Sequence, residues 1–410
     1  MDSCSSKTHR ARLALAMITG AVGLIISVGW LLKPRPAALP SDRAAATIVD
    51  PSAVASSATT APNLSAPTTQ LPPPNLRLTT HGALDQAILD TLNRLRAGID
   101  PEKSRLLLEA LKGNLLRPES KAEAIGAILG FLRSGEDAAT GLAFRVGPKH
   151  ALTEAPTLRT ALLDWLGQLD SRAAADHSVQ ILAAMSSPEE YAVALRNFAQ
   201  GRPEQRDELR NYFDRLASHG AWANQPTAGY LEAFDVVPHL ADPAFINTLS
   251  PHLAPSAHHS LRHASLVALD RLVLANPKGS LHEMLRENAL EDQPLLRASF
   301  LARADVRDRG QRELLEQYLL SSSLSERELD KFLRLFPNAN RFASYNLLTE
   351  SAGHSLADLA ALDAAALERV REWQTQPRFS GLSPRLKQLE NRLVEQVASA
   401  KRSGYLPREN

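Results

Sequence analysis

The sequence predicts an all-α protein, an α-solenoid of antiparallel helix pairs behind one N-terminal transmembrane helix. Three observations predict this fold. Residues 13–32 form an uncharged apolar run, and residues 33–80 are rich in Pro, Ala, Ser and Thr. Residues 81–410 repeat leucines at helical spacing, in segments of about 10–17 residues with short breaks between them. The formal net charge is +1, and without a basic stripe we expect no nucleic acid partner.

The run at residues 13–32 is the predicted membrane anchor. A helix rises about 1.5 Å per residue, so roughly twenty residues cross a hydrocarbon core of about 30 Å. Lys7, Arg10 and Arg12 precede the run, which favours an N-terminus in the cytoplasm. The run is longer than a secretory signal core, and residues 30–33 are a poor cleavage context. We therefore expect a retained signal anchor, with cleavage as the alternative.

The organisation that follows has four segments. Residues 1–12 are a short cytoplasmic N-terminus, 13–32 the transmembrane signal anchor, 33–80 a disordered linker and 81–410 an all-helical repeat-like domain. The linker has few large apolar residues, and its prolines favour an extended spacer. Cys4 is the only cysteine, and a cysteine-free exported domain fits a bacterial periplasm. We expect a single-pass protein of the bacterial inner membrane.

Leucine spacing places the helices of the C-terminal domain, and many of them begin after Pro, Ser, Asp or Asn. The expected helices are 83–96, 104–115, 121–132, 156–169, 172–185, 188–199, 204–217, 225–235, 256–275, 279–288, 294–305, 309–320, 325–335, 340–349 and 383–402. The region 355–410 is expected to form a helix pair that caps the array.

Two of these helices share the pattern L-R-x-A-x-L-x-x-L-x-x-L, one starting at Leu158 and the other at Leu261. A partial third copy starts at Leu296. The pattern resembles the inner helix of HEAT-type repeats, and Leu166-Gly167 matches the end of that motif. A helix pair cannot bury its apolar face alone, so stacked neighbours would produce a superhelix with a concave surface.

An arginine recurs at the second position of each copy: Arg159, Arg262 and Arg297. We expect these arginines to pair with carboxylates or carbonyl groups of adjacent helices. The alternative is a ladder of ligand-binding arginines along the groove.

The densest polar cluster consists of His252, His258, His259 and His263. His259 and His263 would share one helix face, a spacing that can hold zinc, but zinc needs further ligands. Carboxylate pairs at predicted helix starts favour the positive end of the helix dipole; they are Glu189/Glu190 and Glu291/Asp292. Trp165, Trp222 and Trp373 are expected to be packing anchors. We expect no catalytic residue, no metal and no cofactor.

These observations predict a membrane-tethered, non-catalytic scaffold or adaptor that presents a helical-repeat surface to another protein in the periplasm. Residues 210–214 also resemble the start of the R-x-x-F-D-Y motif of bacterial lipase-specific foldases, although Arg215 replaces the tyrosine. That resemblance implies an alternative, an anchored steric chaperone for a secreted client. We expect Phe213 itself to be a core residue of the helix at 204–217. A metal-dependent hydrolase is a further alternative.

Overall fold

The structure is a computed structural model that describes residues 82–286, 290, 292–339, 344–351 and 354–407. The predicted anchor at 13–32 and the predicted linker at 33–80 lie outside the described residues. Within the described residues, no helix combines the length and the apolar character that a membrane crossing requires.

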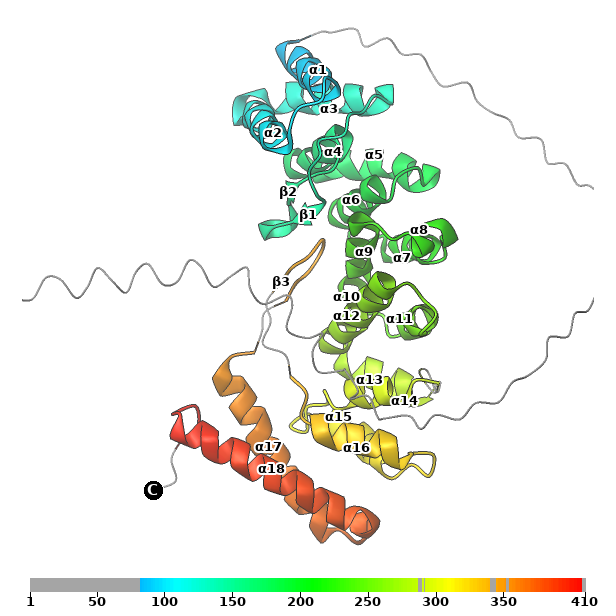
Figure 1. The fold of residues 1–410 in the computed structure, drawn as a ribbon, viewed down its shortest axis with the longest axis vertical. Coiled ribbons are helices and arrows are strands. Elements are labelled where there is room, and N and C mark those ends of the chain that lie inside the picture. Colours follow the sequence, from blue (N-terminus) through cyan, green and yellow to red (C-terminus); the bar gives the residue numbers. More distant parts are fainter. Residues whose placement is uncertain (1–81, 287–289, 291, 340–343, 352–353, 408–410) are drawn as a thin grey trace, which may run out of the picture. The chain divides into compact units, whose positions relative to one another are not determined.

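The described part of the chain is mostly helical (Figure 1). Its first helices are α1 (Ala83–Arg96), α2 (Pro101–Leu115), η1 (Pro118–Ser120), α3 (Lys121–Ser134), η2 (Pro148–His150), α4 (Leu158–Leu169), α5 (Ser171–Ala184), α6 (Pro188–Gly201) and α7 (Arg206–Ala217). The central ones are α8 (Gly220–Asn224), α9 (Ala228–Glu232), η3 (Ala233–Asp235), α10 (Val236–Leu240), α11 (Phe245–Leu249), η4 (Ser250–Leu253), α12 (His259–Ala275) and α13 (Pro277–Arg286). The last are α14 (Pro294–Leu301), α15 (Arg309–Leu319), α16 (Glu326–Leu335), α17 (Leu356–Thr375), η5 (Pro377–Leu382) and α18 (Ser383–Arg402).

Side-chain caps fix many helix starts, as the sequence predicts. Asp100, Asp170 and Ser187 each accept a hydrogen bond from a backbone N–H of the first turn. Such a cap satisfies one of the donors that a helix N-terminus leaves unpaired. The expected bounds are confirmed in full for 83–96 and 383–402, and most other expected helices are shifted by only a few residues.

Most helices pack against helices that lie next to them or a few positions away in chain order. For example, α4 contacts α5 and α6, α12 contacts α10 and α13, and α16 contacts α14 and α18. Figure 1 shows these helices following one another in chain order. The buried side chains form two clusters. The first runs from Ile88 to Phe300 and also includes Leu347 and Leu348, and the second occupies the C-terminal helices around Phe332, Phe336 and Trp373.

Two short antiparallel hairpins interrupt the helices, so the predicted all-helical region is not wholly helical. β1 (Arg145–Val146) pairs with β2 (Leu152–Glu154), and β3 (Ser344–Tyr345) pairs with β4 (Glu350–Ser351). The prediction of a helix at 340–349 is therefore wrong. Leu347 is fully buried in the first cluster together with Leu348, although Phe336 before this segment and Ala366 after it belong to the second. The burial of Leu347 among distant helices outweighs the local preference of this segment for a helix.

A second correction concerns the helix expected at 225–235. The chain instead forms the short helix α9, the 3₁₀ turn η3 and then α10. The bend places Asp235 at the end of η3, where its carboxylate reaches the β3–β4 hairpin.

Candidate binding site

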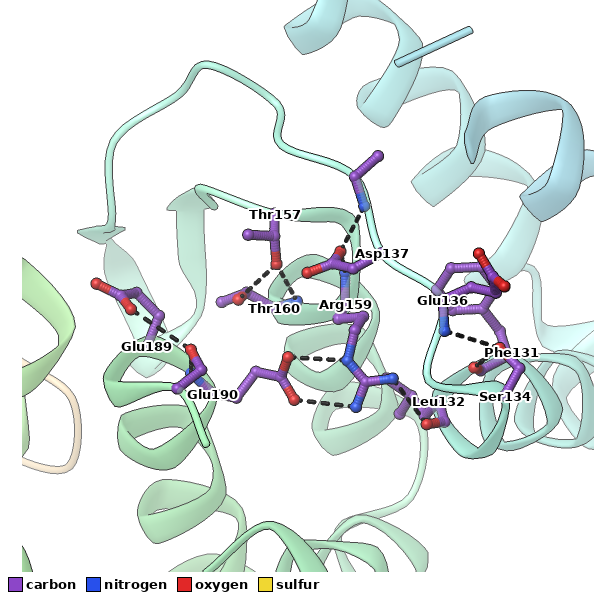
Figure 2. Close-up of polar contacts among 12 residues, drawn as sticks. Phe131, Leu132, Ser134, Glu136, Asp137, Thr157, Arg159, Thr160, Glu189 and Glu190 are labelled. Atoms are coloured by element: carbon purple, nitrogen blue, oxygen red, sulfur yellow. Dashed lines mark hydrogen bonds and ion pairs between the residues drawn. The ribbon is translucent and has the colours of Figure 1, made fainter. Parts of the chain in front are cut away.

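Buried arginine–glutamate pairs join non-consecutive helices. Arg159 of α4 donates from Nε to Glu190 Oε1 at 2.8 Å and from Nη2 to Oε2 at 3.0 Å (Figure 2). Its Nη1 donates to the carbonyl of Leu132 at the end of α3. Arg159 therefore connects α3, α4 and α6, and the prediction that it pairs with adjacent helices is confirmed.

The third sequence copy repeats this contact. Arg297 of α14 donates from Nε and Nη2 to the two oxygens of Glu328 on α16, at 2.9 and 3.0 Å. In both copies the glutamate follows the arginine by 31 residues and lies in the first turn of its helix. Arg262 differs, since it donates to the nearby carbonyl of Pro255. Because Arg159 and Arg297 are engaged by buried carboxylates, they do not form a ladder of ligand-binding groups.

A buried aspartate on α4 holds the first hairpin. Asp164 is fully buried and pairs with Arg196 of α6, with 2.5 Å between Nη1 and Oδ1. The same carboxylate oxygen accepts the backbone N–H of Leu152 in β2 at 3.0 Å. A buried carboxylate is stable only when it is paired and hydrogen-bonded, and this one is both.

A second buried aspartate holds the second hairpin in the same way. Asp235 Oδ2 accepts the backbone N–H groups of Leu348 and Thr349, at 2.6 and 2.7 Å. Asp235 Oδ1 accepts the Thr349 hydroxyl at 2.8 Å and pairs with Arg271 Nη2 at 2.8 Å. The turn between β3 and β4 is therefore fixed to η3 and α12.

The two hairpins also contact each other through His150 and Asn346. The Nδ1–H group of His150 donates to the carbonyl of Asn346 at 2.8 Å, because a carbonyl can only accept. The carbonyl of His150 accepts from Arg196 at 2.7 Å. Lys149 and His150 both have positive φ, which forms the tight turn that presents this imidazole. One polar network thus runs from α4 and α6 through both turns to α12.

A pocket lies beside this network, between α9–η3 and α12. Its volume is about 390 Å³, within the range typical of ligand-binding clefts. Glu232, Asp235 and Arg271 line it together with His259 and His263. We refer to it as the α9–α12 pocket.

Glu232 is the carboxylate of this pocket that no described residue neutralises directly. It forms no hydrogen bond or ion pair within the described residues, whereas Asp235 is paired with Arg271. Burial raises the pKa of Glu232, the nearby Asp235 raises it further, and Arg271 acts in the opposite direction. The pocket therefore contains a desolvated acidic group that a cationic group of a ligand would stabilise.

Helix α12 has an uncovered face at a position where α4 is covered. In the alignment of the two copies, Val267 of α12 corresponds to Asp164 of α4. Asp164 is covered by the β1–β2 hairpin, whereas Val267 is 39% exposed and Leu274 is 44% exposed. Val267 lines the α9–α12 pocket, so an apolar helix face continues from the pocket.

The four histidines of the predicted polar cluster have different surroundings. His258 caps α12, since its Nδ1 accepts the backbone N–H of Ser260 at 3.2 Å, and His252 packs against the ring of Phe234. His259 and His263 line the pocket, but the residues that the structure describes contain no group of three His, Cys, Asp or Glu side chains placed to hold a metal ion.

The predicted tryptophan anchors are largely confirmed. Trp165 and Trp373 are buried, and Trp373 donates from Nε1 to Glu316 at 2.9 Å. Trp222 is half-buried against Tyr191. Glu189 and Glu190 lie in the first turn of α6, as predicted. Asp292 falls outside the helices, and Glu291 lies outside the described residues.

The resemblance to the foldase motif falls on a core helix. Phe213 of α7 is fully buried and makes edge-to-face contacts with Phe234 and Phe245. Arg210 pairs with Asp242 and lies over the Phe245 ring. These side chains stabilise the helical array and do not form an exposed recognition motif.

The sequence alone did not indicate the polar groups of this pocket. The histidine cluster drew attention to α12. Neither Glu232 nor the contact between Asp235 and the β3–β4 turn has a local sequence signal. The contact joins residues 113 and 114 positions apart. No protein-family model, curated protein or solved structure matches this chain.

Proposed function

We propose that the chain is a non-catalytic scaffold or adaptor whose helices form an α-solenoid of the HEAT type. In this proposal residues 13–32 hold it in the bacterial inner membrane, and the solenoid binds another protein in the periplasm. The arrangement of helices supports the solenoid. Most helices pack on helices next to them or a few positions away in chain order, and two arginine–glutamate pairs recur at the same separation.

The observation that carries the binding function is the uncovered face of α12. On α4 the matching face is covered by the chain's own hairpin, whereas α12 exposes Val267 and Leu274 beside the α9–α12 pocket. Exposed apolar side chains around a cleft with polar groups are typical of protein interaction sites. The partner would lie over α12 and insert a side chain between α9 and α12.

Site-specific photo-cross-linking tests this proposal. A benzophenone amino acid replaces Val267 in the full-length chain, expressed in its own host. The matched control places it at Leu106 of α2, another exposed apolar side chain. We expect one partner to be cross-linked from Val267 and not from Leu106.

The partner is then identified by mass spectrometry and purified, and its affinity for Val267→Glu is measured. A loss of roughly tenfold or more would support the proposed surface. Identical adducts from both positions, no adduct at all, or unchanged affinity would contradict it.

The membrane location is tested separately. Protease treatment of intact spheroplasts should degrade the C-terminal region. In a separate experiment without protease, the full chain should remain with the membrane fraction after a carbonate wash. Release of the chain by carbonate, or protection from the protease, would contradict the proposed anchor and orientation.

The burial of Phe213 in the core gives no support to the steric-chaperone alternative.

A further inference from the structure

A cleft between α16 and α18 is lined by four arginines. Arg327 and Arg334 come from α16, and Arg385 and Arg392 from α18. On each helix the two arginines are two turns apart, about 10 Å at about 1.5 Å per residue. The cleft has a volume of about 530 Å³, and the two helices pack against each other.

The positive charge of this cleft exceeds the nearby negative charge. Arg385 has two carboxylates nearby, Glu326 at 3.3 Å and Asp330 at 3.8 Å, and both are largely exposed. Arg327 and Arg334 are exposed and form no ion pair in the part of the chain that the structure describes. Arg334 donates instead to the backbone carbonyl of Asp330 at 3.4 Å.

The guanidinium group of Arg392 is held in place in the cleft by backbone carbonyl groups. Its Nη2 donates to the carbonyls of Leu333, at 3.1 Å, and Phe336, and it forms no ion pair among the described residues. Burial lowers the pKa of Arg392, opposed by the charge of Asp363. Carbonyl groups orient this guanidinium, and no carboxylate among the described residues pairs with it directly, so an anionic ligand would be stabilised there.

The apolar lining between the arginines restricts the class of ligand. Leu333, which is half-buried, lines the cleft together with the buried Leu389. A small oxyanion would engage one or two guanidinium groups and leave the other arginines without a partner. An amphipathic acidic helix would cover Leu333 with its apolar stripe and place carboxylates about seven residues apart, the spacing of the two arginines on each helix.

We propose that the α16–α18 cleft binds an acidic amphipathic helix of a partner protein. This proposal rests on the scaffold function proposed above. Arginine suits this role because its planar guanidinium binds carboxylates through two parallel hydrogen bonds. The surface is distinct from the α9–α12 pocket, which carries an acidic group.

Binding to a defined peptide tests the proposal with the full-length chain. The probe is a fluorescein-labelled helical peptide of about 20 residues, with a leucine stripe flanked by glutamates about seven residues apart. The comparison peptide has glutamine at every glutamate. The variant is Arg327→Gln/Arg334→Gln, which removes the charges of two exposed side chains. The matched control is Arg94→Gln/Arg117→Gln, which removes two charges from exposed positions elsewhere.

We expect the acidic peptide to bind, with affinity reduced roughly tenfold by the α16 double variant and by the glutamine peptide, and unchanged by the control. Absence of binding, equal binding of both peptides, or equal binding to the variant would overturn the proposal. Binding confined to phosphatidylglycerol vesicles or inorganic phosphate would also overturn it. Failure of the Val267 cross-link with success here would reject the α12 surface while leaving the α16–α18 site intact.

Discussion

Arg159 and Glu190 form a two-bond ion pair between α4 and α6, with donor–acceptor distances of 2.8 and 3.0 Å. Arg297 and Glu328 form the same pair between α14 and α16. In each case a helix start supplies the carboxylate and a nearby helix supplies the arginine. The array therefore uses the same device twice to fix how non-consecutive helices pack.

Removing the charge at Glu190 should destabilise the fold strongly. In Glu190→Gln the Arg159 guanidinium stays buried without a carboxylate, so we expect a loss of about 3 kcal/mol in the free energy of unfolding. Urea unfolding followed by circular dichroism measures this loss. The matched control, Glu136→Gln, breaks the exposed pair with Arg96 and should cost less than about 1 kcal/mol. Equal effects would show that burial of the pair contributes nothing.

The helices were predictable because their signals are local. Leucines at three- and four-residue spacing and capping residues such as Asp100 and Ser187 act within one or two turns. The arginine pairs were partly predictable, since a recurring Arg159 and Arg297 implied a common role. Their glutamate partners lie 31 residues away and could not be named from the pattern.

The β3–β4 hairpin and the proposed binding surfaces were not predictable for a related reason. Leu347 is buried in a cluster formed by distant helices, so the segment that contains it forms a hairpin although its composition favours a helix. Glu232 becomes a pocket carboxylate only when α12 packs on α9. The local positive charge of α16 and α18 does not show in the composition, because the net charge of the whole chain is only +1.

The β3–β4 turn should detach from the helical array when its apolar anchor is shortened. Leu347→Ala removes a fully buried side chain, a change that costs about 2–5 kcal/mol where the surroundings cannot relax. A short hairpin can open locally, so we expect faster hydrogen exchange at the Leu348 and Thr349 amides, which donate to Asp235. Leu320→Ala, at an exposed leucine, is the control. Unchanged exchange in Leu347→Ala would mean that Asp235 alone holds the turn.

Acid should destabilise the protein through His177. Burial lowers the pKa of His177 to about 4, helped by the charges of Arg159 and Arg133, and both ring nitrogens lack a hydrogen-bond partner in the described residues. The unfolded chain binds a proton near pH 6.5, so stability falls as the pH drops from about 6.5 to about 4, by up to about 3 kcal/mol.

Urea unfolding at several pH values measures this loss. His177→Leu should flatten the pH dependence across that window, whereas His259→Gln, at an exposed histidine, should leave it unchanged. A pH dependence that is the same in His177→Leu and in the original protein would contradict this assignment.

Neutralising Glu232 should stabilise the fold at neutral pH. Burial raises the pKa of this carboxyl, and Asp235 adds to the effect while Arg271 opposes it. The folded state therefore keeps its proton to higher pH than the unfolded chain, and ionisation above that pKa destabilises the fold. Glu232→Gln should raise the free energy of unfolding at pH 7 by on the order of 1 kcal/mol. This gain should vanish below about pH 4, where the carboxyl is protonated in both states. Glu368→Gln, at an exposed carboxylate, should show neither effect. A loss of stability at pH 7 in Glu232→Gln would mean that the charge contributes favourably to the fold, and the pocket would then have no unsatisfied acidic group to offer a ligand.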